Sequence, residues 1–127
     1  MPFVRIDLAE GTTSEYRQAV ADEVYKAMTG TLNVPANDRF MVVGEHAPGD
    51  FIVDTGYLGI ERSPRCVIIQ VTLNTGRDVQ TKRAFYKALA DGLHERVGLR
   101  REDVFINLVE VVKENWSFGN GEAQYAK

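Results

Sequence analysis

The sequence predicts an α+β fold, a two-layer sandwich in which a four-stranded mixed sheet carries two helices on one face. Three observations lead to this prediction. Short segments rich in β-branched and aromatic residues read as strands, and two longer segments with apolar residues at every fourth position read as helices. The order strand, helix, strand then occurs twice, at an offset of 65 residues. We therefore expect a single domain over residues 1–127, with a pseudo-repeat of about 2–45 and 66–112.

The first half predicts a strand at 2–8, a helix at roughly 13–31 and a strand at 39–45. Thr12 and Glu15 have the spacing of a capping box, in which each side chain satisfies a backbone N–H at the start of the helix. The helix start is therefore expected directly after Thr12.

The second half predicts a strand at 66–74, a helix at 78–97 and a strand at 103–112. Asp78 is suited to cap this helix, and Gly98 is suited to end it. The apolar stripes of the two helices occupy equivalent positions in the repeat: Val20, Val24 and Met28 in the first, Phe85, Leu89 and Leu93 in the second. Because a helix joins the strands of each half, each pair is expected to be parallel.

Two segments fall outside the repeat. Residues 46–64 read as a connection punctuated by glycine and proline, and residues 114–125 read as a C-terminal hairpin with an Asn-Gly turn. A sheet covered on one face by two helices leaves its other face open, so oligomerisation is expected.

Composition narrows the classes of partner. A net charge of -3 argues against nucleic-acid and anionic-membrane surfaces, which attract clusters of Lys and Arg. The single cysteine, Cys66, lies in an apolar run and reads as a buried core residue. His46 and His94 have no second ligand at a short spacing, so no metal site is predicted. Without a signal peptide or a membrane span, a cytoplasmic location is expected.

Pro2 is the leading candidate for chemistry. Methionine ahead of proline is usually excised, and excision of Met1 would leave a secondary amine at the start of the chain. Such an amine titrates near pH ~8, so it can act as acid, base or nucleophile. The simpler alternative is that Pro2 begins an edge strand, where the missing N–H is tolerated.

Several blocks of the sequence resemble the tautomerase superfamily, and within it the malonate semialdehyde decarboxylase group. They lie at residues 34–40, 59–63, 84–87 and 116–124. The resemblance implies a homotrimer with three active sites, each built around a proline amine and needing no metal or organic cofactor.

The resemblance also assigns roles to single residues. Pro2 matches the catalytic proline, and Asp38 matches an aspartate near it. The family presents two arginines separated by one residue; here Arg77 takes the second position and Thr75 stands at the first. An aromatic wall beside the substrate is expected from three residues: Trp116, Phe118 and Tyr125.

The leading interpretation is a decarboxylase acting on malonate semialdehyde or a similar small 3-oxo acid. A protonated Pro2 would stabilise the enolate oxygen that forms as CO2 leaves, Arg77 would hold the carboxylate, and Asp38 would favour the cationic amine. An iminium formed by Pro2 is an alternative electron sink, and the sequence does not separate the two.

Other functions stay open. A neutral Pro2 would suit a tautomerase of a 2-oxo acid such as phenylpyruvate, and Asp38 could direct water in a hydratase side activity. The chain could also be a non-catalytic trimeric binding module. Each site residue has a plain structural reading too: Asp38 as a turn residue, Arg77 as a solvated residue at a helix start, and the aromatic residues as packing groups.

Overall fold

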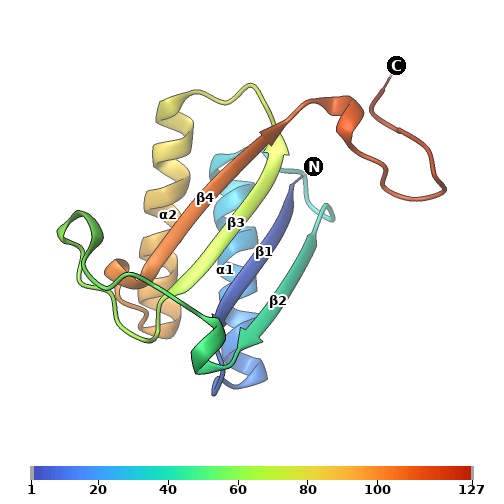
Figure 1. Cartoon of the computed structure of the whole chain (residues 1–127). Coiled ribbons are helices and arrows are strands. Elements are labelled where there is room, and N and C mark those ends of the chain that lie inside the picture. The colour runs from blue at the N-terminus through green and yellow to red at the C-terminus, as the bar shows by residue number, and fades with distance from the viewer. Residues whose placement is uncertain (1, 127) are drawn as a thin grey trace.

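In the computed structural model, which describes residues 2–126, one four-stranded sheet packs against two helices that cover one of its faces (Figure 1). The elements are β1 (Phe3–Ala9), α1 (Ser14–Thr31), β2 (Phe40–His46), β3 (Val67–Asn74), α2 (Val79–Val97) and β4 (Val104–Val111). The α+β sandwich predicted from the sequence is confirmed, and each predicted boundary lies within one residue of the observed one.

The strand order β2-β1-β3-β4 sets the position of every strand end. The strands within each half are parallel, as predicted, and the two halves join through the antiparallel pair β1 and β3. Because of that antiparallel junction, β1 and β2 begin at the edge where β3 and β4 end (Figure 1). Four chain positions far apart in sequence therefore converge at one end of the sheet.

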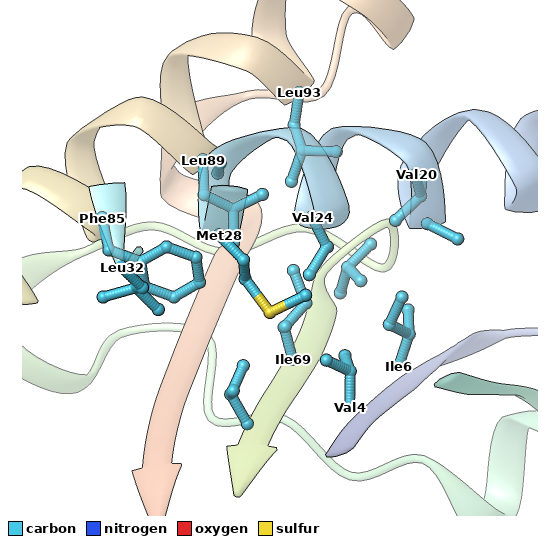
Figure 2. Close-up of a cluster of buried hydrophobic side chains, with 14 of the residues drawn as sticks. Val4, Ile6, Val20, Val24, Met28, Leu32, Ile69, Phe85, Leu89 and Leu93 are labelled. Carbon is cyan, nitrogen blue, oxygen red and sulfur yellow. The ribbon is translucent and has the colours of Figure 1, made fainter. Parts of the chain in front are cut away.

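The core lies between the sheet and the helices. Alternate residues of β1 and β3 point toward the helices and are buried, as the two-residue period of a strand requires. Figure 2 shows the apolar stripes of α1 and α2 directed at these side chains. Among the largest fully buried side chains are Phe85, Ile6, Met28, Leu32, Ile69, Leu73, Leu89 and Leu93. Cys66 is 1% exposed, as expected.

The helix ends agree with the sequence except at one cap. The N-cap of α1 is Thr13, whose hydroxyl accepts from the backbone N–H of Tyr16; the predicted Thr12 instead donates to Glu45. This one-residue error arises because two threonines are adjacent and only one can take the capping position. Asp78 caps α2, and Gly98 ends it with φ 69°, a left-handed conformation that glycine adopts without steric cost. Neither helix combines the length and the apolar character that a membrane span requires within residues 2–126.

The C-terminal segment differs from the predicted hairpin. Asn120 and Gly121 have φ of 61° and 68°, and Glu122 N–H donates to Gly119 C=O, so the Asn-Gly turn is present. No strand occurs within the described residues 114–125, because the Gln124 side chain takes the place of a backbone ladder. Its amide accepts from Phe118 N–H and donates to Gly119 C=O at 2.9 and 2.8 Å. The segment is therefore a closed loop.

Candidate active site

The end of the sheet where β1 and β2 begin is the place where the predicted site residues gather. Pro2 directly precedes β1, Asp38 lies two positions before β2, and Thr75 and Arg77 follow β3. Since Phe3 pairs with Phe40, the parallel register sets Pro2 beside the residue that follows Asp38. The C-terminal loop leaves the sheet at this same end, beyond β4 (Figure 1).

A hollow of about 210 Å³ lies at this end and includes Pro2. Its other lining residues are Phe3, Phe40, Trp116, Ser117 and Phe118. Pro2 is buried, so its ring and nitrogen sit among aromatic side chains with little water around them. Excision of Met1, on which a free amine depends, concerns a residue outside the described range.

The three aromatic residues that the sequence analysis assigned to an aromatic wall lie in contact with one another. The rings of Trp116 and Phe118 are stacked with centroids 5.4 Å apart and planes 14° apart. Tyr125 meets Phe118 edge-on at 4.9 Å, with planes 66° apart. Both geometries are favourable for aromatic pairs. The three rings therefore form one apolar surface, part of which faces Pro2.

Asp38 is 5% exposed, and burial raises the pKa of its carboxyl group. The pKa of Tyr125 is raised as well, first by burial and then by the negative charge of Asp38. Asp38 thus acts electrostatically on the aromatic wall, and Tyr125 stays a neutral phenol at physiological pH. A carboxyl group with a raised pKa at a largely apolar site is a common feature of active sites.

The loop that carries Asp38 is attached to α1. Asn37 has φ 66°, and its backbone N–H donates to the Tyr25 hydroxyl at 3.1 Å. Arg39 lies over the Tyr25 ring at 4.9 Å and donates to Asp22 at 2.7 Å. Asp38 is therefore held from both sides by contacts of its neighbours with one helix.

Arg77 is anchored to the backbone at the end of β3. Its Nε and Nη2 donate to the Leu32 carbonyl at 3.0 and 2.7 Å, and Nη1 donates to the Asn74 carbonyl at 3.3 Å. Three of the five guanidinium N–H groups are thereby used, which leaves two for a ligand. The guanidinium is held in a fixed orientation by the C-terminus of α1.

The predicted residues fall into two groups. Pro2, Trp116 and Phe118 line one hollow, and Tyr125 and Asp38 join it through a ring contact and a charge. Arg77 and Thr75 do not line that hollow. Thr75 is exposed, and its backbone N–H donates to Val111 C=O.

The two groups are joined by a residue that the sequence reasoning missed. Asn74 accepts from Trp116 Nε1 at 2.7 Å through its side chain and from Arg77 through its backbone carbonyl. The available signal was weak, because Asn74 is one of three polar residues in β3, with Gln70 and Thr72. Tyr25 and Gln124 were missed too, because their contacts depend on loop conformation.

Comparisons with known proteins point in one direction. The family model described as "Tautomerase enzyme" matches residues 38–119, and a second model with that description matches residues 2–59. "Probable tautomerase YusQ" of Bacillus subtilis (strain 168) is 38% identical over 124 residues, 98% of each chain.

Two solved structures share both the fold and much of the sequence. FG41 malonate semialdehyde decarboxylase inhibited by 3-bromopropiolate is 41% identical, with a TM-score of 0.90 over 97% of this chain and 93% of the other. A second malonate semialdehyde decarboxylase, described with decarboxylase and hydratase activities, is 34% identical with a TM-score of 0.90, over 97% of this chain and 95% of the other.

Proposed function

Because the chain belongs to the tautomerase superfamily, in its malonate semialdehyde decarboxylase-like group, we propose that it is a decarboxylase of malonate semialdehyde or a similar small 3-oxo acid. The amine of Pro2, exposed after loss of Met1, is its central catalytic group. The observation that carries the proposal is the buried Pro2 in one hollow with Trp116 and Phe118, at the sheet end where Asp38 precedes β2.

The proposed reaction breaks the bond between the carboxylate carbon and its neighbour. The electrons of that bond pass into the adjacent aldehyde as an enolate, CO2 leaves, and protonation at carbon gives acetaldehyde. A protonated Pro2 nitrogen donates a hydrogen bond to the forming enolate oxygen, where charge develops in the transition state. Asp38 as an anion would favour this cationic amine.

The aromatic wall supports the loss of charge at the carboxylate. Water stabilises a carboxylate more than it stabilises neutral CO2. In a site with little water the carboxylate is less stabilised, so the barrier to losing CO2 is lower. The stacked rings of Trp116 and Phe118 line the hollow that holds Pro2 and would reduce the access of water to it. Tyr125 extends this surface.

Arg77 is proposed to hold the substrate carboxylate with its two remaining N–H groups. Since its other N–H groups are fixed on Leu32 and Asn74, the charge is preorganised before substrate arrives. Thr75 stands where the family has a second arginine, so carboxylate binding would rest on one guanidinium and a neutral neighbour. We expect a higher KM for the carboxylate than a two-arginine site would give.

The proposal is tested by NMR with purified protein whose loss of Met1 has been checked by mass spectrometry. Malonate semialdehyde should be converted to acetaldehyde, and Pro2→Ala should lose most of that activity. An undiminished rate in Pro2→Ala would contradict a role for the proline amine. No product from a well-folded, Met-free protein would contradict the decarboxylase proposal.

A tautomerase is the second candidate, because the curated relative is named a tautomerase. This activity needs a neutral Pro2 as general base for a 2-oxo acid such as phenylpyruvate. The two mechanisms have opposite pH dependence. A rate that depends on cationic Pro2 falls as pH rises through the pKa of the amine, and a rate that depends on neutral Pro2 rises there.

A hydratase side activity belongs to the same proposal. Asp38 could orient water toward an acetylenic or halogenated acid held by Arg77. Retention of full hydratase activity in Asp38→Asn would exclude that role for the carboxylate.

We expect the protein to work as a homotrimer. The sheet face away from the helices carries four large apolar side chains between 37% and 50% exposed: Phe40, Val42, Phe105 and Val109. A second and a third copy of the chain would cover them. Size-exclusion chromatography with light scattering should give three times the mass of the chain, and a folded monomer at micromolar concentration would contradict this assembly.

A further inference from the structure

Among the described residues, one hydrogen bond joins the C-terminal loop, which carries the aromatic wall, to the rest of the molecule. Within residues 2–126, the hydrogen bonds of residues 116–126 join members of the loop to one another, with one exception. That exception is the bond from Trp116 Nε1 to the side-chain oxygen of Asn74, at 2.7 Å. Asn74 is the last residue of β3. In the sheet, β3 lies on one side of β1 and β2 lies on the other.

The chemistry of this bond is unambiguous. An indole N–H can donate but cannot accept, so Asn74 presents its carbonyl oxygen to Trp116. The length is at the short end for N–H···O bonds, and both side chains are partly buried, where a lost bond is not fully replaced by water. The indole of Trp116 is thereby held in one orientation against the end of the sheet.

The position of Trp116 affects the two other aromatic rings of the wall. Trp116 is stacked on Phe118, and Phe118 meets Tyr125 edge-on, so a rotation of the first ring would alter the contact that supports the other two. Asn74 also accepts from Arg77 Nη1 through its backbone carbonyl. One residue at the end of β3 therefore contacts both the aromatic wall and the proposed carboxylate-binding group.

We propose that Asn74 is a positioning residue, which fixes Trp116 and through it the wall that faces Pro2. It does not line the hollow and takes no part in bond making. Its catalytic consequence rests on the proposed function, but its structural consequence does not. A side chain at this position without a hydrogen-bond acceptor would leave the indole free to rotate.

Trp116 is the single tryptophan of the chain, so its indole can be observed directly. The variants are Asn74→Leu, which has similar size and no acceptor, and Asn74→Asp, which keeps an oxygen acceptor. Asn115→Leu is the matched control, because it changes an exposed asparagine beside Trp116 whose side chain has no hydrogen bond within residues 2–126. The readouts are hydrogen exchange of the indole N–H, acrylamide quenching of fluorescence, and steady-state kinetics with malonate semialdehyde.

In Asn74→Leu we expect indole exchange and quenching to rise by about three- to tenfold, as for the loss of one neutral hydrogen bond. We expect kcat to fall by about tenfold, because a displaced wall admits water and loosens the reacting geometry. Asn74→Asp should keep indole exchange and quenching near those of the parent protein, because it retains an oxygen acceptor, and Asn115→Leu should stay near the parent protein in all three readouts.

Two outcomes would overturn the proposal. An unchanged indole in Asn74→Leu would show that other contacts hold Trp116, and a mobile indole with unchanged kcat would show that its orientation does not matter for the reaction. Failure of the proposed function is recognised separately, because the parent protein would then form no acetaldehyde, and the exchange and quenching readouts would still report on the indole.

Discussion

The two halves of the repeat each carry a buried aspartate near the start of their second strand, Asp103 one position before β4 and Asp38 two positions before β2. Asp103 is 1% exposed and accepts from the backbone N–H and the hydroxyl of Ser63, both at 2.7 Å, with Arg100 at 3.7 Å. Asp38, at the equivalent position, is 5% exposed, and burial raises the pKa of its carboxyl group.

The partner of Asp103 comes from the segment that leads into β3. In the second half the polypeptide reaches β3 through residues 63–66, and Ser63 fills the space around Asp103. At the equivalent end of the first half, Pro2 precedes β1 and lines the hollow with Trp116 and Phe118. The second half therefore binds its aspartate with Ser63, whereas the first half carries Pro2 and the aromatic hollow at the equivalent end.

The largest effect should come from blocking the amino group. In a variant with one extra residue before Pro2, the nitrogen of Pro2 is part of an amide. The backbone nitrogen of Val67, at the equivalent position of the second half, is an amide nitrogen too. General acid–base groups contribute about 10²–10⁴-fold, so we expect a loss of that size in kcat. Mass spectrometry would establish the N-terminus, and circular dichroism should show an unchanged fold. Full activity of the extended variant would contradict a catalytic role for the Pro2 amine.

Exchanging the two aspartates for asparagine should separate function from stability. Asp38→Asn should lower kcat by about a hundredfold. Asp103→Asn should leave the Pro2 site intact and lower the free energy of unfolding by about 1–3 kcal/mol, because an amide cannot accept both Ser63 bonds. Urea unfolding and steady-state kinetics on both variants check this. Equal effects on activity would remove the distinction between the two halves.

The same pair predicts a pH dependence of stability. The pKa of Asp38 is raised in the folded state, so its neutral form favours folding below the unfolded pKa, and this contribution is lost as pH rises through the folded pKa. Asp38→Asn should therefore gain Tm over the parent protein as pH increases from acid to neutral. Thermal melts across that range measure the difference, and a constant gap would contradict the assignment.

A smaller effect on activity is expected from substitutions just before the two helices. Arg77 and Thr12 occupy equivalent positions, but Arg77 anchors on Leu32 and Asn74, whereas Thr12 binds Glu45. Arg77→Lys should raise KM by about tenfold, because one ammonium cannot replace the planar fork. Thr12→Val should leave KM unchanged. An equal change in both variants would point to a general effect of the helix starts.

The smallest effect concerns the caps themselves. Thr13→Ala should lower stability by about 1 kcal/mol at every pH, because the hydroxyl cap does not titrate. The pKa of Asp78 is lowered by hydrogen bonds from Thr81, so its capping contribution is present above the unfolded pKa and is lost as pH falls through the folded pKa. Denaturation of Asp78→Thr should show weaker destabilisation by acid than the parent protein. An identical acid response would contradict the cap assignment.

Much of this architecture was predictable because its causes are local. Strand and helix periods, the Asp78 cap and the Gly98 stop depend on residues close in sequence, and all were found within one residue. The C-terminal loop was not predictable in the same way. Its closure depends on Gln124, whose reach to Phe118 and Gly119 is a property of the folded loop rather than of any pattern.

The candidate site shows the same division. The resemblance identified Pro2, Asp38 and the aromatic residues, and their convergence followed once β1 and β3 were antiparallel. The contacts of Arg77 with Leu32, and of Asn74 with Trp116, join residues more than 40 positions apart. Such partners have no sequence signature, because any polar side chain at a strand end could have met water instead.

By itself, the sequence determined the doubled strand-helix-strand order and the buried stripes, since each depends on local spacing. Tertiary structure decided that Asp103 would be bound by Ser63 and that Pro2, Trp116 and Phe118 would share one hollow. The physical reason is that burial and hydrogen bonding depend on which segment occupies the neighbouring space, and here Ser63 occupies it for Asp103.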